Sequence, residues 1–304
     1  MKKAISVALF TVLFIAVCAG ALFGYFKYNQ TDFSFADGTK SGTLEISRYN
    51  GDAVNIEIPS SYHGKKVAYI SKEAFRGSDI ESVTFPDSIV SIGESAFNEC
   101  EKLSSVKFGK GLEYLGMFAF RGCVKLESVE FSSELKSFDA SAFLDCENLK
   151  EIKLGDKAEF TDVNGVIFSK DQTTAVWSPA DKDLASFDYP QSVKKYGAFF
   201  FYGHDEITSF DFPDGTEAVE RGVLAECKNL AKVTLPQSVK RIDHSAFYDC
   251  KSLKTINLPE AISSIGDSVF SCDGIKNLDT VLTVKKDTYA YNYAVQNKLS
   301  YELA

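Results

Sequence analysis

Short runs in which apolar and polar side chains alternate return every 23 residues along most of the chain. The run Val83-Thr84-Phe85-Pro86 is typical, because its alternation predicts a half-buried β-strand. A repeat of this length predicts a solenoid, in which each coil of the chain packs on the next. The predicted strands have their first inward residue at Val83, Val106, Val129 and Ile152, and again at Phe187, Phe210, Val233 and Ile256.

The second half of each repeat carries apolar residues at a wider spacing. Ala96, Phe97, Cys100 and Leu103 follow one another at intervals of about a helical turn. We therefore expect a short helical turn in each coil, with Phe97 and Cys100 on its inner face. Stacking of like coils would place these residues in ladders, with neighbouring strands about 4.8 Å apart.

The repeat is interrupted once and is degenerate at its start. The step from Ile152 to Phe187 is 35 residues, one period of 23 plus 12, which indicates an insertion. An earlier copy begins at Ile56 and carries a four-residue insertion around His63. Eight regular strand starts and this earlier copy make nine, so we expect about nine coils.

Most of the cysteines that follow Cys18 obey the same spacing. We expect them to be buried as free thiols, because Cys packs like a small apolar residue. Disulfides between adjacent coils are the alternative that the spacing allows. No Cys-x-x-Cys or Cys/His spacing for zinc occurs, and we expect no metal and no other cofactor. The cysteines in register are Cys100, Cys123, Cys146, Cys227 and Cys250.

The N-terminus differs in character from the rest of the chain. Lys2 and Lys3 precede an uncharged apolar run, Ala4–Phe26, of 23 residues. About 20 apolar residues suffice to span a bilayer as a helix. The lysines before this run place the N-terminus in the cytoplasm by the positive-inside bias.

We therefore expect residues 1–30 to be an uncleaved signal-anchor and residues 31–304 to form an extracellular repeat domain. Cleavage near Ala19-Gly20-Ala21, which would secrete the protein, is one alternative. Lipidation at Cys18 is another, because Ile15-Ala16-Val17-Cys18 loosely resembles a bacterial lipobox.

The charge of the chain argues against a nucleic-acid partner. The formal net charge is −9, and residues 1–30 hold three lysines and no acids. The remainder therefore carries 30 basic and 42 acidic residues, a net charge of −12. Phosphate binding needs clustered positive charge, which this composition does not provide.

The sequence offers no constellation typical of catalysis. It lacks the common hydrolase, metalloprotease and nucleotide-binding motifs. Its three histidines are His63, His204 and His244, and adjacency of the last two to an Asp does not make a triad. Asp181-Lys182-Asp183 lacks the Gly and Glu of a calcium loop. We expect neither an enzyme nor a small-molecule substrate, and an extracellular hydrolase is the disfavoured alternative.

The outward positions of the predicted strands form a candidate binding surface. They alternate with the inward residues, so they would stack in polar rows on one face of the solenoid. The alternative is an ordinary solvated sheet face. The candidate residues are Ser105, Lys107, Ser128, Glu130, Glu151, Lys153, Ser186, Asp188, Ser209 and Asp211.

A rival patch consists of aromatic residues near the interruption. Trp177, Phe199 and Tyr202 are expected to be exposed there, and aromatic residues are enriched at binding hot spots. Packing within an inserted hairpin is the alternative explanation for Trp177.

The repeat resembles that of the BspA-type leucine-rich repeat proteins. Residues 230–250, LAKVTLPQSVKRIDHSAFYDC, are similar to the family unit, and the resemblance extends over roughly residues 43–304. Residues 164–179, NGVIFSKDQTTAVWSP, look like the family's hairpin island, which would lie at about 160–180. The chain end, about 281–304, is similar to its C-terminal cap.

This resemblance implies a β-rich stack of coils and a bacterial surface protein that adheres to host matrix proteins or to other bacteria. We therefore expect a protein-binding or adhesion module. A binding or scaffold subunit of a cell-envelope complex is the alternative.

Overall fold

The protein is a parallel β-solenoid of about 11 turns. The computed structural model describes residues 32–131, 135–156, 158–272 and 280–304. The predicted membrane anchor at Ala4–Phe26 and the alternative lipid site at Cys18 lie outside these residues. Within the described ranges, no helix is both long enough and apolar enough to cross a membrane.

One face of the solenoid carries the strands predicted from the alternating runs. Neighbouring strands are parallel and lie in the register of the repeat, with Val83 opposite Val106 and Val129 opposite Ile152. The predicted strands that form are β3 (Asn55–Glu57), β6 (Ser82–Thr84), β8 (Ser105–Lys107), β10 (Ser128–Glu130), β12 (Glu151–Lys153), β17 (Ser209–Asp211), β19 (Lys232–Thr234) and β21 (Thr255–Asn257), and the same face continues with β23 (Val281–Val284) and β24 (Tyr301–Leu303).

A second face carries shorter strands. The sheet order β1-β2-β5-β7-β9-β11 begins with an antiparallel hairpin and continues in parallel, with β4 (Ser61–Tyr62) on the side of β5. Its strands are β1 (Phe33–Asp37), β2 (Thr43–Tyr49), β5 (Lys65–Ile70), β7 (Ser91–Ile92), β9 (Tyr114–Leu115) and β11 (Ser137–Phe138). Farther along lie β16 (Lys195–Tyr196), β18 (Ala218–Val219), β20 (Arg241–Ile242) and β22 (Ser264–Ile265).

The number of turns exceeds the nine that were expected because both ends of the array continue the ladders. At the N-terminal end, β2 pairs in parallel with β5. At the C-terminal end, β23 and β24 extend the ladder beyond β21. The α-helix α2 (Tyr289–Asn297) lies between β23 and β24, is capped by Thr288, and buries Ala290 and Ala294.

The expected short helical turns are wrong for most coils. At Ser95–Cys100, the N–H groups of Ser95, Phe97 and Glu99 donate to the next coil, whereas those of Ala96, Asn98 and Cys100 donate three residues back. Ser95 and Glu99 have left-handed backbone conformations, with φ of 55° and 62°. This alternation is incompatible with a helix, because consecutive helical N–H groups all donate within the same helix. Within the described residues, a helical turn replaces it at η2 (Ala140–Phe143).

The predicted Phe and Cys ladders are present on the inner side of these turns. Phe75, Phe97 and Phe120 stack with ring centroids 4.5 and 5.0 Å apart and nearly parallel planes. The Cys100 thiol donates to the Phe75 carbonyl at 3.1 Å, and the Cys146 thiol to the Phe120 carbonyl at 3.0 Å. All six cysteines of the described chain are buried and free, which confirms the free-thiol prediction.

The insertion forms a small antiparallel sheet across the middle of the array. Its strands are β13 (Phe160–Val163), β14 (Val166–Ser169) and β15 (Thr174–Trp177), and β15 pairs in parallel with β16. Both faces of this sheet are buried: Ile167 and Trp177 belong to the N-terminal core, whereas Val166 and Phe168 belong to the C-terminal core. The inserted sheet therefore divides the molecule into two hydrophobic cores.

One predicted strand does not form. The backbone around Phe187 pairs with no strand, and Phe187 itself is only half-buried. The Asp183 carboxylate accepts the N–H groups of Ala185 and Ser186 at 3.1 and 3.2 Å, and also the Ser186 hydroxyl. These bonds hold residues 183–186 in a turn, so the Ser186 N–H is not available for a ladder.

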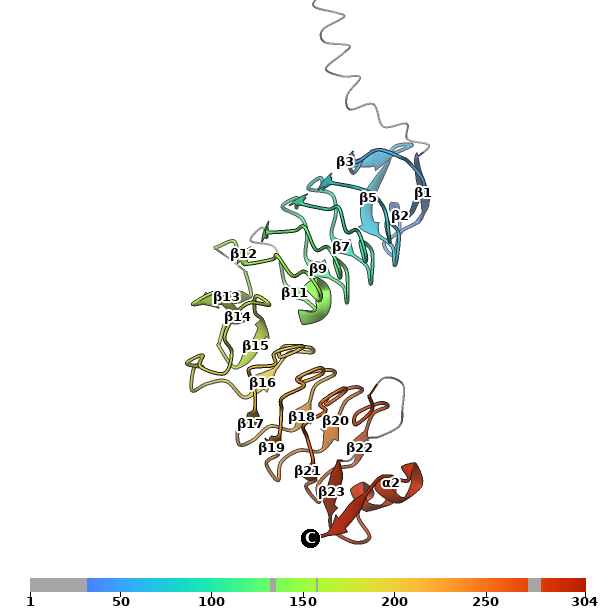
Figure 1. The fold of residues 1–304 in the computed structure, drawn as a ribbon. Helices are drawn as coiled ribbons and strands as arrows, with labels where there is room; N and C mark the ends of the chain where they lie inside the picture. The colour runs from blue at the N-terminus through green and yellow to red at the C-terminus, as the bar shows by residue number, and fades with distance from the viewer. Residues whose placement is uncertain (1–31, 132–134, 157, 273–279) are drawn as a thin grey trace, which may run out of the picture.

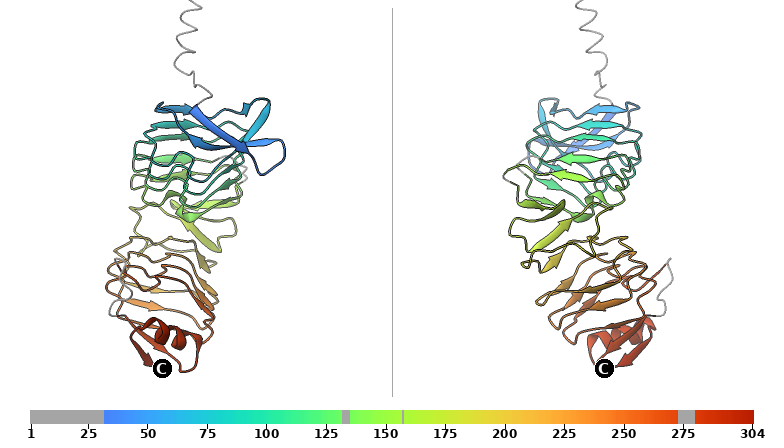
Figure 2. Two further views of the ribbon diagram at one scale, coloured as in Figure 1. Left: turned by 90° about the vertical axis from the view of Figure 1, so that its right-hand side faces the viewer. Right: turned by 60° about the vertical axis from the view of Figure 1, so that its left-hand side comes forward.

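The array is bent, and the two faces lie on opposite sides of the bend (Figures 1 and 2). In Figure 1, β12, β17 and β21 follow the outer side, whereas β9, β11, β20 and β22 follow the inner side. The inserted sheet lies where the bend is greatest.

Candidate binding surfaces

The outer strand face presents the ten candidate residues to solvent. All ten side chains are exposed, including Ser186, which ends the turn, and Asp188, which follows it on irregular backbone. The strand pairs place Ser128 beside Glu151 and Glu130 beside Lys153. Whether this face binds a partner stays a prediction.

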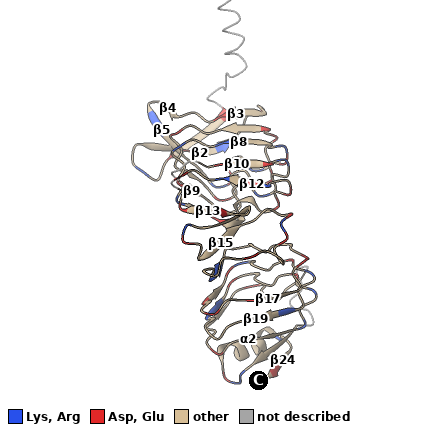
Figure 3. Cartoon of the chain, turned by 90° about the vertical axis from the view of Figure 1, so that its left-hand side faces the viewer, with Lys and Arg blue, Asp and Glu red and all other residues tan. Residues whose placement is uncertain are grey.

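The charges on this face are mixed. Figure 3 shows acidic and basic residues interspersed over the outer side. Lys153 and Glu151 form an exposed pair at 3.4 Å, which contributes little to stability in water. The unpaired segment 183–188 separates two parallel pairs, β10-β12 and β17-β19, so the ten residues do not form one unbroken ladder.

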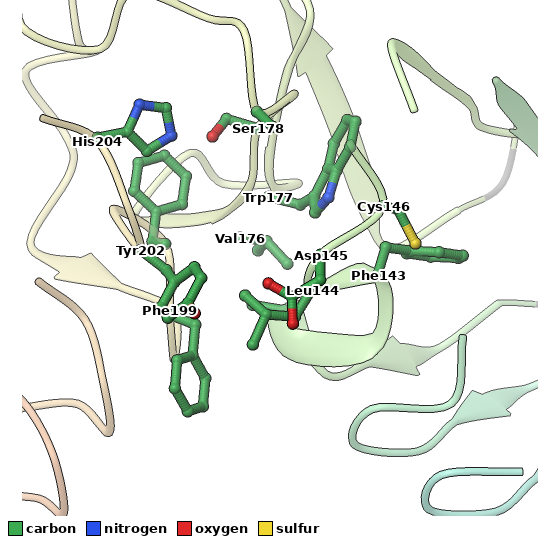
Figure 4. Close-up of a pocket in the computed structure, with 13 residues that line it drawn as sticks. Phe143, Leu144, Asp145, Cys146, Val176, Trp177, Ser178, Phe199, Tyr202 and His204 are labelled. Atoms are coloured by element: carbon green, nitrogen blue, oxygen red, sulfur yellow. The ribbon is translucent and has the colours of Figure 1, made fainter. Parts of the chain in front are cut away.

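A second candidate surface lies at the junction of the two cores, where a small cavity of about 70 Å³ opens beside the inserted sheet (Figure 4). Trp177, Phe199 and Tyr202 all line it, so the structure brings the predicted aromatic residues together. The expectation that Trp177 is exposed is wrong: its side chain is 7 % exposed, because it packs into the N-terminal core. Phe199 and Tyr202 are half-buried.

Polar groups around this cavity are already paired. Asp145 accepts a bond from Arg121 Nε at 2.7 Å, and the Tyr202 hydroxyl donates to Glu226 at 2.9 Å. Burial raises the pKa of Tyr202, and the nearby Asp145 and Glu226 carboxylates raise it further. Tyr202 is therefore a neutral donor at neutral pH.

The histidines are held in structural contacts. His204 occupies the cysteine register, is buried, and contacts Glu206 through Nδ1 at 2.7 Å. His244 is exposed, and its Nδ1 accepts the Asp267 N–H at 3.0 Å. The Asp181–Asp183 segment is also engaged, since Asp183 closes the turn described above and Lys182 donates to the Asn164 carbonyl. Among the described residues, no group of three or more potential metal ligands is present.

A larger groove, of about 620 Å³, lies on the inner side of the bend. One wall contains β11, and the opposite wall contains Lys195 of β16 together with Gly197 and Ala198. The inserted sheet contributes Phe160 and Val176, among other residues, between these walls. Most of its charged residues are paired, and Lys195 and Glu220 approach to 3.1 Å.

Arg221 is the basic residue of the groove wall that has no ion pair among the described residues. Its guanidinium lies over the Phe199 ring, 5.8 Å from the centroid. Its Nε is buried and has no hydrogen-bond partner, and no carboxylate of the described chain forms an ion pair with it. The guanidinium of Arg121 lies over Phe118 in the same way, at 5.6 Å, but is paired with Asp145.

The sequence reasoning missed Arg221 and the inner groove. A signal was available, because the positions one period of 23 before and after Arg221 are Ala198 and His244, neither of which carries a guanidinium. The groove itself depends on where the inner ladder is interrupted, which the repeat spacing does not specify.

The in-register parallel strands, the stacked Phe ladder and the exposed polar rows define a leucine-rich repeat solenoid. The chain belongs to the BspA-type leucine-rich repeat family, whose model matches residues 68–181 and 178–300 in six copies. Repeats of this family generally form protein-interaction scaffolds and are generally not catalytic. No curated protein matches the chain.

The chain is similar to solved structures of bacterial proteins, to different degrees. The pneumococcal vaccine antigen PcpA is similar with a TM-score of 0.61 and 19 % identity, over 91 % of this chain and 97 % of that one. A leucine-rich repeat protein of T. pallidum has a TM-score of 0.45 and 24 % identity, over 75 % and 90 % of the two chains. A leucine-rich cell-surface protein of Faecalibacterium prausnitzii has a TM-score of 0.46 and 18 % identity, over 91 % and 94 %.

Proposed function

We propose that the protein is a non-catalytic adhesion module of a bacterial cell surface, which binds a protein partner through its outer strand face. The observation that carries the proposal is the set of exposed polar side chains on rigid parallel strands, in a family of interaction repeats. A rigid stack loses little conformational entropy when a partner docks on it, so modest contacts suffice for binding. Host matrix proteins and proteins of other cells are the proposed partners.

Changing the charge of the outer strand face tests whether this face binds the partner. The net charge of −12 on residues 31–304 favours a basic partner, and added salt should weaken such an association. We expect the full-length protein in detergent to bind a partner from a panel of matrix proteins and intact cells. Serine replacement of Glu130, Asp188 and Asp211 together should weaken that binding.

The matched control replaces three exposed carboxylates away from the candidate positions, Glu101, Glu147 and Asp214, by serine. It changes the net charge equally, so a loss confined to the first triple variant assigns the contact to the outer strand face. A partner that binds both triple variants as well as it binds the wild type would exclude this face.

We also propose that Ala4–Phe26 is retained as a membrane anchor, with the repeats outside the cell. Its 23 uncharged residues are long enough to span a bilayer. Cell fractionation with N-terminal sequencing should find a membrane-bound chain that keeps its original N-terminus. A soluble product that begins near Leu22 would instead show a cleaved signal peptide.

A further inference from the structure

The inner strand ladder ends in an open edge at the groove. In the order β1-β2-β5-β7-β9-β11, the last strand pairs with β9 alone. The N–H groups of Ser137 and Asp139 donate back to the carbonyls of Glu113 and Leu115. In a parallel ladder the backbone groups of the residue between them, Phe138, then point to the other side. No strand of the described chain pairs with that side.

An open edge of this kind is a template for an added strand. Peptides that bind by strand addition use backbone hydrogen bonds for affinity and side-chain contacts for specificity. Ser137 and Phe138 line the groove, so the edge lies beside it, although Phe138 itself is only 5 % exposed. In Figure 1, β11 and β16 stand on either side of the middle of the array, with β15 between them.

The opposite wall supplies a charge that lacks a partner. Arg221 lines the groove, and its stacking on Phe199 holds the guanidinium in place. The buried Nε of Arg221 is not open to a ligand, but the terminal guanidinium nitrogens can donate to a carboxylate, the group that pairs best with a guanidinium. A ligand carboxylate in the groove would meet a pre-positioned donor.

The other charged residues of the groove restrict how much negative charge the ligand can carry. The groove also contains the carboxylates of Asp139, Glu159, Glu220 and Asp243. Glu220 and Asp243 are paired with basic residues. It is therefore Asp139 and Glu159, which form no ion pair in the described chain, that disfavour a polyanion or an acidic run, together with the net charge of −12. Apolar contact is offered chiefly by the half-buried Phe160, because Phe138 and Val176 also line the groove but are largely buried. The groove therefore suits a single carboxylate between apolar groups.

The geometry points to a second binding site in the inner groove, which takes an extended segment of a partner protein. The segment adds as a strand beside Phe138 of β11 and places one Asp or Glu on Arg221, with apolar side chains against Phe160 and Val176. Backbone hydrogen bonding at a sheet edge selects a peptide over an acidic sugar. This site is separate from the outer strand face and does not depend on it.

The test begins with a displayed library of random seven-residue peptides, selected on the full-length protein in detergent micelles. We expect the selected peptides to share one Asp or Glu flanked by apolar residues. Arg221→Gln should weaken their binding about tenfold or more, because a charge-assisted pair is lost. Changing the peptide's Asp to Asn should weaken its binding to the wild-type protein by a similar factor. This measurement leaves the fold of the protein unchanged.

Arg121→Gln is the matched control, because it removes a guanidinium that is stacked on a Phe ring but already paired with Asp145. Strand addition adds a further expectation: methylation of one alternating set of peptide amides should abolish binding, and methylation of the other set should be tolerated.

The proposal is overturned if the library yields no acidic binder, if selected peptides bind the Arg221→Gln and Arg121→Gln variants equally, or if both methylated sets behave alike. The outer-face triple variant should bind the peptides normally. A result in which that variant loses peptide binding would also place the site outside the groove.

Discussion

Individual residues show why the coils fit together so closely. Each Phe of the ladder stacks on its neighbours, and each in-register thiol donates to a backbone carbonyl of the preceding coil. Cys100 is fully buried, so its side chain acts both as core filling and as a hydrogen-bond donor. The repeat spacing predicted these ladders correctly, because residues one period apart must stack when the strands are in register.

Alanine substitution should distinguish the buried positions of a coil from its exposed positions by their cost in stability. Phe97→Ala deletes a side chain that is 0 % exposed and should lower the free energy of unfolding by about 3–5 kcal/mol. Ser105→Ala, on the exposed outer face, should change it by no more than about 0.5 kcal/mol. Denaturant titration compares the two. Equal losses would mean that the assignment of buried and exposed positions is wrong.

The thiols should make the fold sensitive to alkali. Burial raises the pKa of the Cys100 and Cys250 thiols from an ordinary value of 9.0 to about 12. Between pH 9 and pH 12, the unfolded chain then loses these protons while the folded chain keeps them. Stability is full below pH 9 and falls as the pH rises, by about 1.4 kcal/mol per pH unit for each such thiol. Thermal unfolding between pH 7 and pH 11 measures the effect, and a melting temperature independent of pH would contradict it.

At the scale of elements, sequence reasoning was least successful for the tight turns of each coil, such as Ser95–Cys100. Apolar residues three apart suit a helical turn, and they suit equally well the observed series of tight turns, which have two left-handed residues in most coils. Nothing in the spacing separates the two. The strand missing at Phe187 has a similar origin, because its alternating pattern is correct but a local carboxylate, Asp183, takes the backbone donor first. The groove and Arg221 depend on the point at which a ladder stops, which is a property of several coils together.

The left-handed positions make a testable distinction between two glycines. Gly77 and Gly222 both have positive φ, at 67° and 58°. A Cβ at Gly77 would meet no atom within 4 Å, whereas one at Gly222 would lie 2.2 Å from the Phe199 ring. Gly77→Ala should therefore cost about 1 kcal/mol of stability, which is the backbone strain alone. Gly222→Ala should cost more stability, since Phe199 must move as well. Denaturant titration measures both losses, and equal losses would refute the prediction.

At the scale of the whole molecule, the inserted sheet separates two cores that share few side chains. Ile167 and Trp177 pack on one side, and Val166 and Phe168 on the other. In repeat proteins, each coil is stabilised chiefly by its neighbours, so a partition in the array weakens the coupling between its halves. The halves should then differ in stability rather than unfold as one unit.

Phe97 belongs to the N-terminal core and Phe247 to the C-terminal core, so alanine at each should lower a different unfolding transition. Calorimetry resolves the transitions. Trp177, the one tryptophan of the chain, packs in the N-terminal core, so its fluorescence should follow the transition that Phe97→Ala lowers. A single transition shifted alike by both variants would show that the cores are coupled.

The inserted sheet also bears on how such a chain can change over evolutionary time. Recombination between similar 23-residue units adds or deletes whole coils, and a parallel ladder accepts a coil wherever its neighbours present the same register. Because the two stacks meet through this sheet rather than through one continuous ladder, a duplication in one stack leaves the register of the other unchanged. The array can therefore lengthen on either side of the sheet while the walls around Phe138 and Arg221 keep their positions, so the length of the array and the chemistry of the groove can vary independently.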